Sequence, residues 1–487
     1  MLPLRLLRFL PLWLCYAITT VAHAAPAPLL LYGGALPLCS SMAMEQCQRN
    51  QLDRLAVAQS KRQQPLTLTA ERFLQLEALQ LGDQHALASS HASITAQLPL
   101  LSLTAAQLQQ QPQLQPWLAT LSRAEWQAVQ QLLSEPQTDR YGQRLQERAW
   151  LEASHNPASV DIINAIAAMA SDPSRILIVT AASDAPYDSA DRFLDLFPKA
   201  QWLGLDRSLT QAQQRHRCSD LTAVQQQHLR LARQRLYPHR FAQQRRLCQQ
   251  PASAAEHIAK AELILFTPGK PANLMQTLLL ADGSPTLAWQ AIQTRFRQGS
   301  VAIAAPAIEL FGGLLPPPPQ QADIGISTAP QRALLSQTPR ALLGFSNDSA
   351  AIIAQGQLTV LGRQGVWLAQ PLPSNHGWQS SFAQAGETIN LASGEVAFLQ
   401  QSEQEARGAQ HQPELIVLPD NGQLLGLTDA LCGNLAEQSL GHFSHQQQPY
   451  GVIARVNGAS KLQRSANQPH CSYQQLQLQF GPRQPRD

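Results

Sequence analysis

This sequence lacks the short motifs that identify a chemistry directly. It contains no HExxH zinc-peptidase motif, no P-loop and no GxGxxG dinucleotide fingerprint. It also carries little net charge, because 36 basic residues face 33 acidic ones, and the resulting +3 creates no whole-molecule field to steer a partner. We therefore expect no cofactor, no bound metal and no nucleic-acid partner.

Apolar runs of membrane-spanning length are also missing. The run over residues 9–21 is too short to cross a bilayer, and no later segment is long enough. This run follows Arg5 and Arg8 and precedes small residues ending at Ala24, which is the order of a secretory signal peptide. Cys15 lies inside it without a lipobox. We expect residues 1–24 to be removed, with cleavage after Ala24, and the mature protein to be periplasmic or secreted.

Six cysteines remain beyond the expected cleavage site. An even number in an exported chain indicates disulfides, although six cysteines permit 15 connectivities. We predict the pairing that is most local in sequence. The predicted pairs are Cys39–Cys47, Cys218–Cys248 and Cys432–Cys471.

Composition and periodicity predict a globular α/β protein. Hydrophobic residues make up 44% of the chain and charged residues 14%, and 487 residues suggest two or three domains. Short apolar runs alternate with helical patterns between residues 175 and 310, as in a parallel sheet. Chemistry in such sheets collects at the carboxyl ends of the strands. Here these ends are 267–270 and 304–307.

Two regions depart from this alternation. Residues 42–156 read as mostly helical, with capping signals at Thr104 and Ser122, and form an expected insertion. Three roles are open for this insertion: a lid over the site, a docking surface, or packing without a function of its own. Residues 370–487 read as short strands and turns, and we expect a small β-rich accessory domain there.

Two clusters of charged or metal-ligating residues remain ambiguous. Six arginines between Arg230 and Arg246 fit either a solvated helical face or an anion site, and no aromatic stacking platform accompanies them. His442 and His445 have the i, i+3 spacing of a helix but no third metal ligand.

The order of several segments resembles the serine peptidases related to cyanophycinase and dipeptidase E. The segments that carry the resemblance are Phe266-Thr267-Pro268-Gly269-Lys270-Pro271, Ala304-Ala305-Pro306-Ala307-Ile308-Glu309, Asp323, Arg332 and Leu342-Leu343-Gly344-Phe345. The resemblance implies a flavodoxin-like parallel sheet with helices on both faces, as in class I glutamine amidotransferases. It covers residues 25–369, with the helical insertion inside this range.

The catalytic motifs of that family are altered in this chain. The resemblance places the serine at Pro306, the histidine at Gly325 and the acid at Asn347, where a slip of one residue would bring in Asp348. Neither Pro306 nor Gly325 has a side chain that can attack a carbonyl carbon or take up a proton. Pro268 and Pro271 also remove backbone N–H donors from the glycine-rich turn. The resemblance therefore implies the frame of a hydrolase without its triad.

The leading hypothesis is an exported, catalytically inactive protein that binds a peptide, an acidic small molecule or an envelope partner. The alternative is an active serine-type hydrolase with relocated catalysts, acting on aspartyl peptides or cyanophycin-like substrates. Ser183 and Lys270 are candidates for such relocation. The expected cleft residues are Gly33, Gly34, Ser183, Gly269, Lys270 and Pro306.

Overall fold

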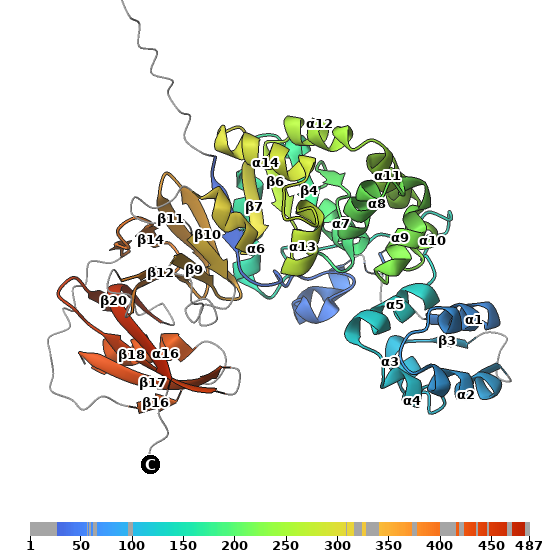
Figure 1. The fold of residues 1–487 in the computed structure, drawn as a ribbon, viewed down its shortest axis with the longest axis horizontal. Helices are drawn as coiled ribbons and strands as arrows, with labels where there is room; N and C mark the ends of the chain where they lie inside the picture. Colours follow the sequence, from blue (N-terminus) through green and yellow to red (C-terminus); the bar gives the residue numbers. More distant parts are fainter. Residues whose placement is uncertain are drawn as a thin grey trace, which may run out of the picture.

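A computed structural model describes most of the chain after residue 26. It shows two large sheets and a separate group of helices (Figure 1). The described residues are 27–55, 57, 60–61, 66–95, 101–307, 309–315, 324–327, 340–372, 377–399, 415–417, 423–434, 437–445, 448–464 and 470–482. The expected signal peptide lies outside them.

The first sheet contains five parallel strands. Their spatial order is β5-β4-β6-β7-β1, with bounds β1 (Leu29–Tyr32), β4 (Ile176–Val179), β5 (Gln201–Leu203), β6 (Leu263–Phe266) and β7 (Ala302–Pro306). Every residue of β1, β4, β6 and β7 is buried. Burial on both faces explains why these strands read as continuous apolar runs. The prediction of an α/β fold with a parallel sheet is confirmed.

The helices between these strands begin at residues suited to a helix start. Asn156 and Thr286 accept backbone N–H bonds as N-caps, and prolines open several other helices. The helices are α6 (Pro157–Ala168), α7 (Pro186–Leu196), α8 (Arg207–Gln214), α9 (Leu221–Gln227), α10 (Arg233–Leu236), α11 (Pro238–Gln249), α12 (Ala252–Lys260), α13 (Pro271–Leu278) and α14 (Leu287–Arg297). Trp289 of α14 packs edge-on against Phe266 of β6 in the main core.

Strands between residues 324 and 397 belong in part to the first sheet and in part to the second. The first sheet continues beyond β1 through antiparallel β10 (Ser349–Ala354), β11 (Gln357–Gly362), β14 (Thr388–Asn390) and β15 (Val396–Ala397). The second sheet contains β8 (Ile324–Ser327), β9 (Ala341–Phe345), β12 (Val366–Pro371), β13 (Trp378–Ala383), β16 (Leu415–Val417), β17 (Gln438–His445), β18 (Gln448–Arg455), β19 (Lys461–Arg464) and β20 (Cys471–Pro482), beside α16 (Gln423–Asn434). The C-terminal region is therefore β-rich, as expected, and its strands are mostly antiparallel. Strands on both sides of residue 370 enter both sheets.

The helical insertion has a small core of its own. It contains β2 (Leu66–Leu68), β3 (Leu101–Leu103), α1 (Ala70–Ala78), α2 (Gln84–Thr95), α3 (Ala105–Gln109), α4 (Gln115–Leu118) and α5 (Arg123–Leu133). Phe73 and Trp117 are buried at its centre. Thr104 and Ser122 form complete capping boxes, so both predicted helix starts are confirmed.

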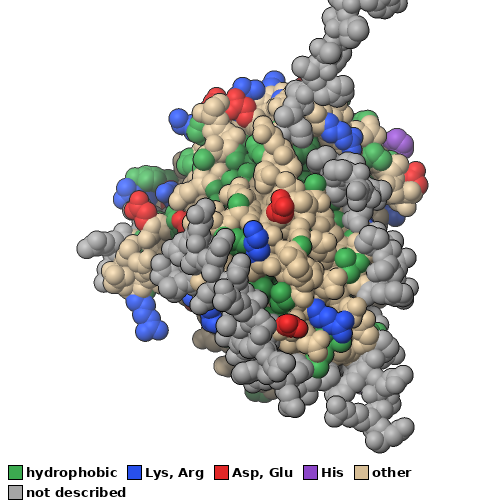
Figure 2. All heavy atoms as spheres, turned by 90° about the vertical axis from the view of Figure 1, so that its left-hand side faces the viewer, with side chains coloured by type: hydrophobic (Ala, Val, Ile, Leu, Met, Phe, Trp, Pro, Cys, Tyr) green, Lys and Arg blue, Asp and Glu red, His purple; other side chains and the backbone are tan. Residues whose placement is uncertain are grey.

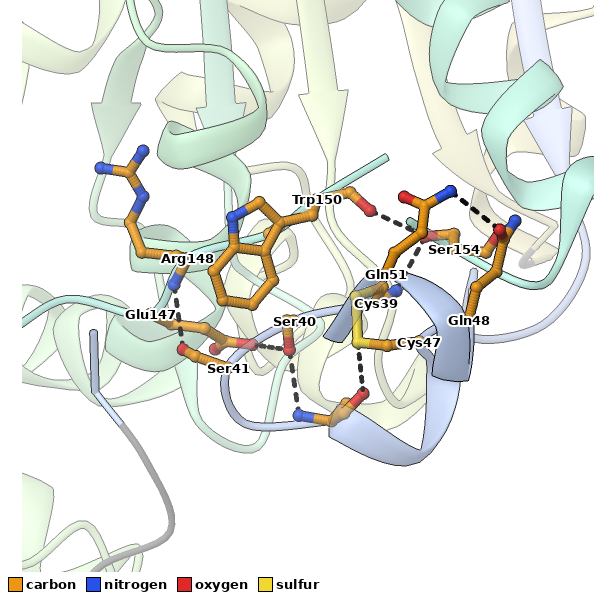
Figure 3. The surroundings of a disulfide bond; sticks show 12 residues. Cys39, Ser40, Ser41, Cys47, Gln48, Gln51, Glu147, Arg148, Trp150 and Ser154 are labelled. Carbon is orange, nitrogen blue, oxygen red and sulfur yellow. Dashed lines mark hydrogen bonds between the residues drawn. A yellow bond between two sulfur atoms is a disulfide. The ribbon is translucent and has the colours of Figure 1, made fainter. Parts of the chain in front are cut away.

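Two adjacent segments, residues 39–47 and 147–154, join this insertion to the rest of the chain and are held together by hydrogen bonds (Figure 3). We call these two segments the neck. The Cys39–Cys47 disulfide lies in the segment that leads into the insertion, and residues 147–154, which lead out of it, lie beside this disulfide. Ser40 donates to Glu147 at 2.7 Å, and the Cys39 N–H donates to Ser154 Oγ at 2.8 Å. The other two disulfides are Cys218–Cys248 and Cys432–Cys471, so all three predicted pairs are present.

Candidate functional site

The carboxyl edge of the parallel sheet brings several predicted cleft residues together. Tyr32 pairs with Pro306 in the ladder between β1 and β7. The following turn, Gly33 and Gly34, passes so close to the β9–β10 connection that a Cβ on Gly33 would lie 2.2 Å from the Ser346 carbonyl oxygen. A Cβ on Gly34 would lie 2.9 Å from Oδ1 of Asn347. The positions expected for the nucleophile and the acid therefore flank one glycine turn.

No sharp elbow occurs at Pro306. This residue is the last of β7, and its fixed ring excludes the left-handed backbone geometry of a strained turn. The next amide, Ala307 N–H, continues the ladder by donating to the Tyr32 carbonyl at 2.7 Å. An amide used in this way is not available to stabilise an oxyanion.

The turn after β6 is closed by a second backbone bond. Lys270 N–H donates to the Ala182 carbonyl at 2.8 Å, and a Cβ on Gly269 would lie 2.1 Å from the same oxygen. Glycine is required there because the turn after β6 touches the turn after β4. The turn is thus packed against its neighbour, with its Lys270 amide already used.

The polar side chains at this edge are paired with one another. Nζ of Lys270 lies 2.7 Å from Oδ2 of Asp184. Burial would raise the pKa of Asp184, but hydrogen bonds from Lys270 and Asn273 outweigh it and lower that pKa. Ser183 Oγ accepts the Ala185 N–H at 3.1 Å, which fixes the turn into α7. Neither candidate for a relocated catalyst contacts an imidazole within the described part of the chain.

The position expected for the histidine lies in the other sheet and not at the glycine turn that Pro306 and Asn347 flank. Gly325 belongs to β8 and pairs with Leu342 in the second sheet, whereas Pro306 belongs to the first. Asn347 is exposed. Its neighbour Asp348 has φ +60° and accepts a hydrogen bond from Asn156 Nδ2 at 2.9 Å.

Two of the six arginines are buried and Arg240 is half-buried, so a solvated helical face is wrong for these three members of the run, whereas the other three are exposed. Arg233 pairs with Asp206 at 2.8 Å, and their side chains are 5% and 6% exposed. Arg240 pairs with the fully buried Asp191 of α7. Arg230, also buried, lies 3.6 Å from Asp184. Burial of these cations is possible because each has a carboxylate beside it.

A row of three aspartates on α7 that contacts the insertion was not predicted from the sequence. Asp188, Asp191 and Asp195 have the i, i+3, i+7 spacing of one helical face. They pair with Lys61, Arg144 and Arg148, all from the insertion. The spacing of the three aspartates could be recognised in the sequence, whereas their basic partners, which are distant along the chain, could not.

A cavity of about 530 Å³ lies between the insertion and α7, α10 and α11. On its floor Lys61 donates to Asp188 and to Tyr237, the second at 2.9 Å. Burial alone would lower the pKa of Lys61, but the charge of Asp188 and the contact with Tyr237 raise it, so the amine stays charged. Burial also raises the pKa of Tyr187 to about 12. None of the predicted cleft residues lines this cavity.

No candidate metal site was found in the part of the chain described. It contains no group of three or more potential metal ligands. His442 and His445 lie in β17, a strand, so the helical spacing that linked them does not apply. In the view of Figure 2, acidic and basic side chains are interspersed among neutral ones on the face drawn. No helix in the described ranges is long and apolar enough to cross a membrane.

Comparisons with known proteins leave the family open. No family model matches the sequence, and no curated protein is similar to it. Among solved structures, the crystal structure of a peptidase from an acI-B1 Actinobacterium is 15% identical and has a TM-score of 0.26. The match covers 47% of this chain and 91% of that one. A TM-score this low carries no argument about function.

Proposed function

We propose that this protein is an exported binding protein with a peptidase-type α/β scaffold and no serine-hydrolase chemistry. The carrying observation is the state of the carboxyl edge around Pro306. A proline occupies the nucleophile position, and the amides of Ala307 and Lys270 are bonded to backbone carbonyls. Acyl transfer needs a nucleophile, a base and free oxyanion donors at one place.

Export is supported by the three disulfides, which persist in oxidising compartments. The signal-peptide prediction falls outside the described residues. The proposed cleft includes Gly34, Gly269 and Lys270, with Asp184 compensating the lysine. We propose that it receives a peptide or a small acidic molecule. Docking to an envelope protein is an outcome that co-purification from native extracts would reveal.

The test is an assay of the purified mature protein against α-aspartyl and β-aspartyl dipeptides and cyanophycin. We expect no turnover, and no labelling by a serine-reactive fluorophosphonate. The Pro306→Ser variant should also remain inactive, because the single hydroxyl would lack a base and oxyanion donors. Ser183→Ala serves as the matched control for a relocated nucleophile. Turnover or labelling that Ser183→Ala abolishes would establish the alternative, an active hydrolase.

A further inference from the structure

The cavity beneath the insertion has the charge balance of an anion site. Three basic side chains line it, Lys61, Arg144 and Arg233, beside two carboxylates, Glu135 and Asp188. Arg144 and Arg233 are paired with Asp191 and Asp206, two carboxylates that do not line the cavity. The lining therefore carries one more positive than negative charge.

Two of the guanidinium groups that line the cavity are held in fixed orientations. Arg144 lies over the Tyr237 ring at 4.0 Å and donates to Asp191 at 2.7 Å. Arg233 lies over the Tyr187 ring at 4.5 Å and donates to Asp206 at 2.8 Å. A stacked and hydrogen-bonded guanidinium loses little entropy on binding, and its planar fork matches the geometry of a carboxylate.

The insertion also contributes neutral polar side chains to the lining. Gln127 and Gln130 of α5 and Thr104 before α3 line the cavity from the insertion. A glutamine amide both donates and accepts, which suits the amide groups of a peptide or the polar end of an organic acid. The volume of about 530 Å³ is in the range of small-molecule sites.

We propose that this cavity binds a small carboxylate-bearing molecule, held by Arg144 and Arg233 against the glutamine wall of α5. The inference rests on the proposed binding function and adds a second binding site to the proposed cleft at the Pro306 edge. The carboxylate has two possible sources, a free dicarboxylic acid or the C-terminus of a short peptide. Their shared chemistry is the planar anion.

Calorimetric titration of the full-length protein distinguishes these sources. The probes are glutarate with its diamide, and trialanine with its C-terminal amide. At least one carboxylate probe should bind, more weakly as salt is raised, and its amide should not. Binding of glutarate alone identifies the free acid, and binding of trialanine identifies the peptide terminus. If neither carboxylate binds at millimolar concentration, or if the amides bind equally well, the proposal is wrong.

Variants locate the binding site. Arg144→Gln should weaken binding about tenfold or more, the loss of one charge-assisted hydrogen bond. Arg245→Gln, an exposed change on α11, is the matched control and should bind as the wild type does. Ala105→Leu adds volume to the cavity wall without changing charge and should also weaken binding. Wild-type affinity in both cavity variants would overturn the proposal.

Mass spectrometry of the trialanine mixture separates the two hypotheses. Intact peptide together with measurable binding supports both. Cleaved peptide contradicts the proposed absence of hydrolysis, whereas intact peptide without any carboxylate binding contradicts only the cavity inference.

Discussion

Replacing Asp191 by alanine should destabilise the protein and loosen the insertion from α7. The Asp191 carboxylate is fully buried and accepts hydrogen bonds from Arg144 at 2.7 Å and from Arg240 Nε at 2.8 Å. Its removal leaves two guanidinium groups whose side chains are only 19% and 13% exposed. One of them belongs to the insertion, so the substitution also removes one of the ion pairs across the interface.

The size of the effect follows from the burial of the cluster. Removing one partner of a buried ion pair costs about 3–5 kcal/mol. Because both arginines retain some exposure, water can solvate them partly, and we expect the lower end, about 3 kcal/mol. At roughly 2 °C per kcal/mol for a unit of this size, the thermal midpoint should fall by about 6 °C.

Urea unfolding followed by circular dichroism measures this change, and limited proteolysis reports release of the insertion. Asp161→Ala, an exposed change on α6, is the control and should stay within about 0.5 kcal/mol of the wild type. A loss below about 1 kcal/mol for Asp191→Ala, or unchanged proteolysis of the insertion, would refute the reasoning.

Lowering the pH from 7.5 to 5.5 should reduce the urea midpoint of the wild type more than that of His228→Gln. Burial and the charge of Arg207 lower the pKa of His228, so below about pH 6.5 the unfolded chain binds a proton more readily than the folded chain does. An equal fall of the urea midpoint in the two proteins would contradict this. Gly269→Ala should cost about 1–3 kcal/mol, because the new Cβ would meet a carbonyl oxygen at 2.1 Å, and an unchanged thermal scan would exclude that contact. Replacing both cysteines of the Cys218–Cys248 pair by serine should cost about 3–4 kcal/mol through release of a 30-residue loop, measured by urea unfolding; no loss would show that the unfolded loop is already restricted.

The parallel sheet was predictable because its strands are buried on both faces. The four residues of β6 are each 0% exposed, and only an uninterrupted apolar run is stable in such a position. The helix starts at Thr104 and Ser122 were predictable for a local reason, since a capping box lies within four residues. The disulfides followed from proximity in sequence.

The cavity and the interlaced sheets were not predictable, because they depend on contacts between distant segments. Arg144 meets Asp191 across 47 residues, and no local pattern states which arginine finds which carboxylate. In the same way, β10 and β12 are close in sequence but belong to different sheets. Alternation along a strand indicates which face is buried but not which sheet accepts the strand. The limits of the two proposed domains, at residues 25–369 and 370–487, therefore stay a prediction.

The neck at Cys39–Cys47 has a consequence for how the gene can be rebuilt. The chain enters and leaves the insertion at neighbouring points, because β-bridges connect Ser40 with Ala149 and Cys47 with Ser154. The helices in between can be excised and the two ends rejoined by a short linker without rerouting any strand of the main sheet. Such a shortened protein would uncover Leu231, which now packs into the core of the excised part, so that position would need a polar replacement.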